Sequence, residues 1–219
     1  TSPYSLEALA QFPLKAPRPF VERIEKGNWH NPLLLQIWPS AFEENQADGF
    51  VADPLNEEEF NPVPGLLHKY QGRVLLTAAP HCAIHCRYCF RRHFDYRANS
   101  PSRAQWEEAF AYIAADSSIE EVILSGGDPL AISDKQFHWL LQQLANIKTL
   151  TTVRIHTRLP IVIPQRITSE LVSCLNETRL RVVMVVHCNH YQELDNAVTD
   201  KFDTLADVGV TMLNQSVVL

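Results

Sequence analysis

The chain has 219 residues, 46% of them hydrophobic and 20% charged, with a formal net charge of −6 at pH 7 and a pI of about 5.8. This composition excludes a mainly disordered chain and suits one domain with a modest extension. The sequence has no run of about 18 apolar residues, which argues against a membrane-spanning helix. The acidic balance argues against recruitment to nucleic acid or to an anionic membrane. The first residues do not resemble a secretory signal, so we expect a cytoplasmic protein.

Residues 1–70 differ in composition from the rest of the chain. Prolines recur, and acidic residues collect between positions 41 and 60. We expect an irregular extension of short helices and loops, with the acidic run 57–59 on a solvated face. The sequence leaves open whether this extension wraps the core of its own chain or reaches a second subunit of a homo-oligomer.

Residues 71–219 predict a second unit in which strands and helices alternate. The apolar runs predict strands at 74–78, 122–124, 152–156, 182–186 and 210–213. Most runs are continuous, which favours a parallel sheet buried on both faces. Capping boxes at Ser102–Gln105 and Ser133–Gln136 begin two predicted helices, and 167–175 and 198–205 are two more. Such βα units predict either a barrel or an open doubly wound sheet.

Three of the five cysteines form a C-x3-C-x2-C pattern after the first of these strands, at Cys82, Cys86 and Cys89. The odd number of cysteines argues against a disulfide framework. The spacing allows an iron–sulfur cluster, or a structural zinc with a fourth ligand from one of three histidines: His81, His85 or His93. Of the two remaining cysteines, Cys174 is expected to pack in the core and Cys188 to point away from its neighbour His187.

A glycine pair follows the second of these strands, at Gly126 and Gly127 in LSGGDPL. Glycines there allow close approach of the backbone to a ligand. The cysteine pattern, with Tyr88 before its last cysteine, and this turn together resemble the radical S-adenosylmethionine (radical SAM) superfamily. In that superfamily three cysteines hold a [4Fe–4S] cluster, and the open iron binds S-adenosylmethionine (SAM).

Further segments resemble the lysine 2,3-aminomutase family, and most of all the short type that serves elongation factor P. They are, in order, CRYCFRRHF, SGGDPL, TRLPIVIPQRIT, VVHCNH and LNQSVVL. The resemblance implies a partial parallel (βα) barrel and a radical isomerisation of L-α-lysine to β-lysine by 1,2-amino migration. It implies three cofactors: a [4Fe–4S] cluster, SAM and pyridoxal phosphate (PLP). It also implies an external electron donor of the flavodoxin or ferredoxin type, with the product passed to elongation factor P lysylation, and neither a membrane nor a direct nucleic-acid partner.

The same resemblance assigns roles to individual residues. The cluster ligands are Cys82, Cys86 and Cys89. The SAM-binding residues are Tyr88, Ser125, Gly126, Gly127, Asp128, His187 and Gln215. Arg91 is assigned to the substrate carboxylate, which a guanidinium binds in bidentate fashion. The PLP-binding residues are Lys69, Tyr70 and Arg73.

Other basic residues near these motifs have less defined roles. The arginines beside the cysteines, Arg87, Arg91 and Arg92, are expected to favour thiolates. Three residues of the 152–166 region have no assigned role: His156, Arg158 and Arg166. Of these, Arg158 follows a strand and is placed to face the site.

The lysine that anchors PLP in the family lies beyond the last residue of this sequence. Lys135, Lys148 and Lys201 fall on predicted helices and are poor substitutes. Since the sequence stops in or just after a strand, we expect that a C-terminal part is missing and that PLP-dependent turnover is weak or absent.

Two alternatives to this function remain. One is another radical SAM enzyme, of the activase or methylthiolating type. The other is a zinc-stabilised interaction module; metal analysis separates them, since a cluster contributes about four irons and a zinc site one zinc.

Overall fold

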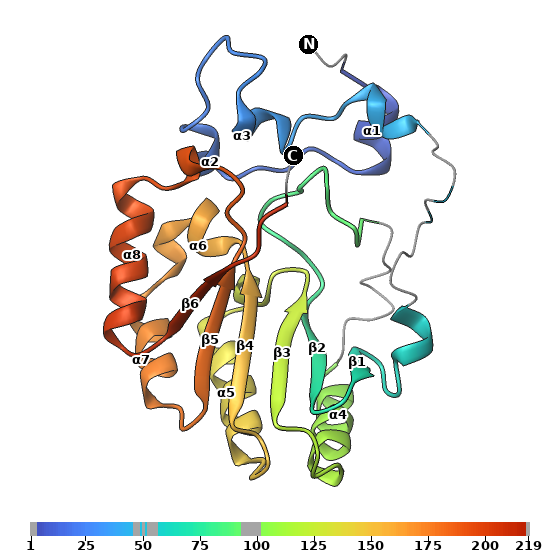
Figure 1. Cartoon of the computed structure of the whole chain (residues 1–219), viewed down its shortest axis with the longest axis vertical. Helices are drawn as coiled ribbons and strands as arrows, with labels where there is room; N and C mark the ends of the chain where they lie inside the picture. The colour runs from blue at the N-terminus through green and yellow to red at the C-terminus, as the bar shows by residue number, and fades with distance from the viewer. Residues whose placement is uncertain (1–3, 46–48, 50, 52–56, 93–101, 218–219) are drawn as a thin grey trace.

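One six-stranded sheet organises the structure, a computed structural model that describes residues 4–45, 49, 51, 57–92 and 102–217 (Figure 1). The strands are β1 (Leu66–Tyr70), β2 (Arg73–Ala79), β3 (Glu121–Gly126), β4 (Thr152–Thr157), β5 (Arg181–Val186) and β6 (Thr211–Asn214). Their spatial order follows the chain, with β2 to β6 parallel and β1 antiparallel to β2. Because this order has no reversal point, it is that of a barrel rather than of a doubly wound sheet. The sheet is open between β1 and β6, so the barrel is partial, as predicted.

Four long helices connect the parallel strands: α4 (Arg103–Ala115), α5 (Asp134–Asn146), α7 (Ser169–Glu177) and α8 (Asn196–Asp207). Both predicted capping boxes are present, at Ser102 and Ser133. Shorter turns are α6 (Leu159–Val162), η3 (Pro129–Ala131), η4 (Pro164–Arg166) and η5 (Tyr191–Glu193). No helix among the described residues is long and apolar enough to cross a membrane.

The five predicted parallel strands are confirmed, and β1 is the strand that the sequence analysis missed. A two-residue turn joins β1 to β2, with Gly72 at φ +80° and with Tyr70 opposite Arg73. Arg73 therefore begins β2 instead of preceding it, and the sheet includes the last residues of the predicted extension. The helix predicted from 167 begins at Ser169, because the side chain of Thr168 caps it. Lys148 lies in the turn after α5, not on a helix.

The two faces of the sheet differ in β3 and β4, which corrects the prediction that both are buried there, while β5 is buried along five consecutive residues, as predicted. Alternate residues of β4, such as Val153 and Ile155, are fully buried under the helices. The residues between them, including His156, are only half-buried. β3 follows the same pattern, and Ile123 and His156 line a cavity on the inner side. The helices thus cover one face, and the other face encloses the site.

The N-terminal segment (residues 4–45) crosses the carboxyl ends of the parallel strands (Figure 1). It holds α1 (Leu6–Gln11), α2 (Arg18–Val21), α3 (Pro32–Leu35) and η1 (Ala41–Glu44), and η2 (Glu57–Phe60) follows it. Phe20 and Leu33 are fully buried in the common core, and Arg23 pairs with Asp195 at 2.7 Å. Of the two arrangements left open, the segment therefore wraps the core of its own chain.

Candidate active site

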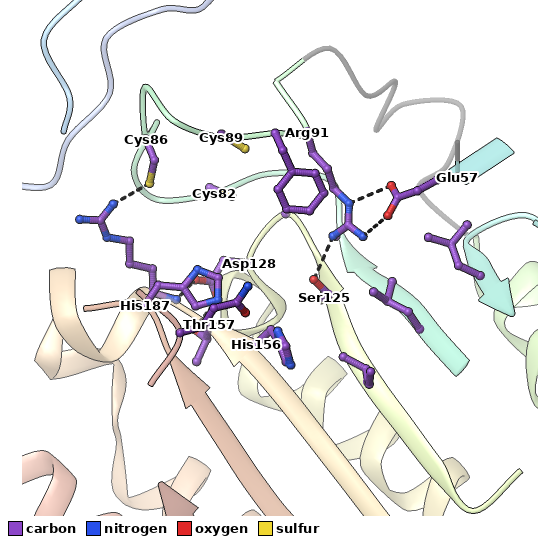
Figure 2. A pocket seen from close by; sticks show the side chains of 18 of the residues that line it. Glu57, Cys82, Cys86, Cys89, Arg91, Ser125, Asp128, His156, Thr157 and His187 are labelled. Carbon is purple, nitrogen blue, oxygen red and sulfur yellow. Dashed lines mark hydrogen bonds and ion pairs between the residues drawn. The ribbon is translucent and has the colours of Figure 1, made fainter. Parts of the chain in front are cut away.

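The cysteine loop (residues 80–92) follows β2 at the carboxyl edge of the sheet. Its three cysteines are free, half-buried thiols that line one cavity of about 510 Å³ (Figure 2). Burial raises the pKa of Cys82, and the Asp128 carboxylate adds to this effect. Thiols in such a place become thiolates when they bind a metal that displaces the proton. The cavity is therefore suited to a group that takes three thiolate ligands.

Each thiolate ligand of a [4Fe–4S] cluster binds a different iron atom. The three sulfurs therefore need to surround one cavity and do not need to converge on one point. Cys82, Cys86 and Cys89 line one cavity in this way, and they fit this group (Figure 2). Among the described residues, no group of three or more His, Cys, Asp or Glu side chains converges on a position for a single metal ion. Of the histidines considered as zinc ligands, His85 bonds the Pro13 carbonyl at 2.7 Å, and His93 lies outside the described residues.

The N-terminal segment holds the cysteine loop through hydrogen bonds to the backbone of the loop. Lys15 Nζ donates to the Cys82 carbonyl at 2.7 Å, and the Lys15 carbonyl accepts from the His85 amide at 2.9 Å. The Arg87 amide donates to the Gln36 carbonyl at 2.8 Å. These bonds fix the backbone between the cysteines, and the spacing of the thiols follows from them.

The arginines of the cysteine loop are paired with carboxylates. Arg87 and Arg92 both bind Glu43 in η1, at 2.6 and 2.8 Å. Burial raises the pKa of Cys89, while Arg91 and Arg92 oppose this without overcoming it. Arg91 and Arg92 thus lower the pKa of Cys89, in the predicted direction. Burial raises this pKa by more, so the thiol form is favoured overall.

The glycine turn (residues 125–128) packs directly under the start of the cysteine loop. A Cβ on Gly127 would lie 2.3 Å from the His81 carbonyl oxygen, and one on Gly126, at φ +105°, would lie 2.6 Å from the Thr77 side chain. The Asp128 amide donates to the same His81 carbonyl at 2.9 Å. Gly127 is therefore required for the contact between the turn and the loop, and Gly126 for the close approach of the turn to β2, reasons that the sequence does not reveal.

The Asp128 carboxylate is buried and joins the glycine turn to the end of β4. It accepts from Thr157 Oγ1 at 2.6 Å and from the amides of Arg158, Leu130 and Leu159 at 2.7, 3.0 and 3.1 Å. Burial raises the pKa of Asp128, and these four donors oppose it. Protein donors thus occupy this side chain, and its predicted contact with SAM stays a prediction.

Arg91 lies between η2 and the glycine turn. It makes a bidentate pair with Glu57, at 2.5 and 3.0 Å, and donates to Ser125 Oγ at 3.1 Å (Figure 2). Glu57 is only 8% exposed, so the prediction that this acidic run faces solvent is wrong for Glu57, while Glu59 is exposed. The ion pair between Arg91 and Glu57 could not be predicted from a local pattern, because the two residues are 34 positions apart.

Two histidines face the cavity at the ends of neighbouring strands. His156 of β4 and His187 after β5 have ring centroids 6.2 Å apart. Burial lowers the pKa of each to about 4, so both are neutral at pH 7. Their Nε2 atoms are buried and have no hydrogen-bond partner among the described residues. These nitrogens have unused hydrogen-bonding capacity, which suits the SAM role predicted for His187.

The remaining predicted residues also line the cavity. Gln215 follows β6, and its amide donates to the Val186 carbonyl at 2.9 Å. Lys69, Tyr70 and Arg73 lie at the β1–β2 turn, at the opposite end of β2 from the cysteine loop. All three residues are exposed, so a phosphate there would lie at the amino ends of the parallel strands, away from the thiols.

Arg158 and Tyr88 belong to a polar network behind the cluster ligands. Arg158 Nη1 donates to Cys86 Sγ at 2.7 Å and also bonds the Tyr88 hydroxyl. Asn189 donates to the same hydroxyl, and the Arg158 guanidinium pairs with Glu193 at 3.1 Å. Sequence reasoning placed Arg158 near the site without a role and missed Asn189 and Glu193.

The other cysteines are structural: Cys174 is buried in α7, and Cys188 Sγ contacts the His190 carbonyl.

Comparison with known proteins agrees with this geometry. The model of the radical SAM superfamily matches residues 76–217, and the chain belongs to that superfamily. The chain is also 52% identical to the L-lysine 2,3-aminomutase of Haemophilus influenzae and 49% identical to that of Escherichia coli, over 98% and 95% of its length. The enzyme of the same name from Clostridium subterminale is 38% identical over 91% of the chain. The chain spans 64%, 60% and 48% of the length of these relatives.

Proposed function

We propose that the chain carries the radical SAM part of an L-lysine 2,3-aminomutase, which converts L-α-lysine into β-lysine by moving the amino group from the α to the β carbon. The observation that carries the proposal is the shared cavity. The three thiols, the glycine turn and Arg91 all line it, in a chain 52% identical to a protein named L-lysine 2,3-aminomutase. The other radical SAM classes considered above have no comparable support.

The cysteine loop would hold a [4Fe–4S] cluster through Cys82, Cys86 and Cys89. The glycine turn, His187 and Gln215 would bind SAM beside it. Reductive cleavage of bound SAM supplies a carbon radical that removes hydrogen from the substrate, and PLP carries the migrating amino group. The protein's part is to hold these groups in register within the cavity and to exclude water from them.

Arg91 would bind the carboxylate of lysine. Its support is chemical: the guanidinium already accommodates a carboxylate, that of Glu57, in bidentate geometry. Ser125 holds Nη1 at 3.1 Å, which fixes the plane of the guanidinium. Substrate would displace Glu57 or share the guanidinium with it.

Lys69 and Arg73 would bind the phosphate of PLP, since both are cations that line the cavity at the β1–β2 turn. Delivery of the β-lysine to elongation factor P, an electron donor of the flavodoxin or ferredoxin type and a cytoplasmic location complete the proposal. They rest on the family resemblance.

The test is anaerobic reconstitution with iron and sulfide, followed by reduction and addition of SAM, with and without lysine and PLP. Formation of 5′-deoxyadenosine together with β-lysine supports the whole proposal. Formation of 5′-deoxyadenosine without β-lysine supports the radical SAM part alone, as expected for a chain with weak PLP-dependent turnover. One zinc per chain and no iron uptake contradict the enzyme assignment altogether. Arg91→Lys is the matched variant: it keeps the charge but loses the bidentate fork, so the response to lysine should weaken while cluster content stays the same.

A further inference from the structure

Arg158 contacts a sulfur that the proposed cluster would use. Its Nη1 lies 2.7 Å from Cys86 Sγ, and its side chain is only 5% exposed. Among the described residues, Cys86 is the one member of the cysteine trio whose sulfur accepts a side-chain hydrogen bond; Cys89 takes one from the backbone of Arg91. The three thiols are therefore not equivalent, and the difference comes from Arg158 together with the Tyr88 side chain beside it.

The guanidinium of Arg158 is held from three directions. Its Nη2 bonds Gln36 of the N-terminal segment and pairs with Glu193 at 3.1 Å. Its plane lies over the rings of Phe20 and Tyr88, at 5.3 and 5.6 Å. Such support leaves the donor to Cys86 little freedom to turn away.

Glu193 is the fixed counter-charge in this arrangement. It is fully buried, and its Oε1 accepts from Gln36 Nε2 at 3.0 Å and from the amides of Asn189 and His190 at 2.9 and 3.1 Å. A carboxylate that accepts this many hydrogen bonds is held in place. Glu193 neutralises the charge of Arg158 but does not remove the hydrogen bond from Arg158 to the Cys86 sulfur.

We infer that Arg158 is a positioning residue that sets the reduction potential of the cluster through the Cys86 sulfur. The inference rests on the proposed function, because it requires a cluster on the three cysteines. Hydrogen bonds to ligand sulfurs and nearby net charge both tune the potentials of iron–sulfur clusters. The reduced cluster carries one more negative charge, so a donor to Cys86 stabilises it and raises the potential.

Substitutions in the ion pair between Arg158 and Glu193 should shift the reduction potential of the cluster in opposite directions. Glu193→Gln removes the negative charge and leaves Arg158 donating, so the potential should rise. Arg158→Gln combined with Glu193→Gln removes both charges and the charged donor, so the potential should fall. The double variant also avoids leaving either charge buried alone, which is strongly destabilising. Arg158→Lys, which keeps the charge without the fork, is the second variant if the double variant does not fold.

The experiment is a redox titration of the anaerobically reconstituted protein with Ti(III) citrate. One electron passes from Ti(III) to the oxidised cluster, and the reduced cluster is followed by electron paramagnetic resonance. The expected fall in the double variant, or in Arg158→Lys, is about tenfold in the reduction equilibrium, which is 59 mV for one electron. Arg166→Gln is the matched control. Arg166 is also a partly buried, ion-paired arginine after β4, but it bonds Asp134 and the Leu130 carbonyl instead of a cysteine.

The results separate the inference from the function on which it rests. Opposite shifts in the two variants, with the control unchanged, support it. A loss of iron with an unaltered potential of the remaining clusters means that Arg158 is only structural and overturns the inference, while the proposed function stands. A wild-type protein that takes up no iron overturns both.

Discussion

Gly127→Ala tests whether the cysteine loop and the glycine turn act as one unit. The added methyl would lie 2.3 Å from the His81 carbonyl oxygen and 2.6 Å from the carbonyl carbon and amide nitrogen of the same residue. All three are backbone atoms, so no side chain can rotate away. Ordinary contact begins near 3.4 Å, and the start of the cysteine loop therefore has to move by about 1 Å.

The cost follows from that displacement. Overpacking of this kind destabilises a protein by roughly 1–3 kcal/mol, and a misplacement of about 1 Å in an active site reduces rates by roughly 100-fold. We expect Gly127→Ala to lower the free energy of unfolding in urea by that amount, to reduce iron uptake and to slow formation of 5′-deoxyadenosine. Gly27→Ala is the control for a glycine-to-alanine change. Gly27 has φ +80° but nothing within 4 Å of an added Cβ, so a loss of stability there should leave iron uptake intact. Wild-type stability and full iron content in Gly127→Ala would refute the reasoning.

Three further outcomes are expected from buried polar groups. Glu57→Gln should lower the free energy of unfolding by roughly 3–5 kcal/mol, since it leaves the Arg91 charge buried without a counter-ion; an unchanged urea midpoint would contradict this. His156 and His187 have folded-state pKa values of about 4, below the ordinary 6.5, so the unfolded chain binds protons first and stability should fall as pH drops from 6.5 towards 4. His156→Gln should flatten this dependence between pH 7 and 5, and parallel curves would count against it. Cys82→Ser should abolish stable cluster loading, measured as iron and sulfide per chain, while a chain that keeps full iron would exclude Cys82 as a ligand.

The sequence predicted the parts of the site that depend on local pattern and on strand ends. The cysteine trio, the glycine pair, His187 and Gln215 each follow a predicted parallel strand, and parallel strands end at one edge of a sheet. The order of the apolar runs was therefore enough to bring these residues together. β1 was missed because its five residues precede a two-residue turn and pair antiparallel, outside the βα rhythm.

The supporting contacts could not be predicted because they depend on tertiary packing. Gln36 reaches Glu193 across 157 positions and Arg158 across 122. Glu57 stands in an acidic run that is typical of a solvated surface, and only the fold brings Arg91 to it. Gly127 was expected to make room for a ligand, whereas a methyl there would first meet the backbone of His81.

The bonds between the N-terminal segment and the cysteine loop also bear on the order in which the chain folds. Lys15 meets Cys82 across 67 positions, and Arg87 meets the Ala8 carbonyl across 79. Contacts of such separation close large loops and form after the local βα units. Residues 8–36 are synthesised before the sheet and thus find their partners late. Until they do, the cysteine loop lacks the bonds from Lys15 and Gln36 that hold its backbone, so the three thiols would be more accessible to iron and sulfide than in the folded chain.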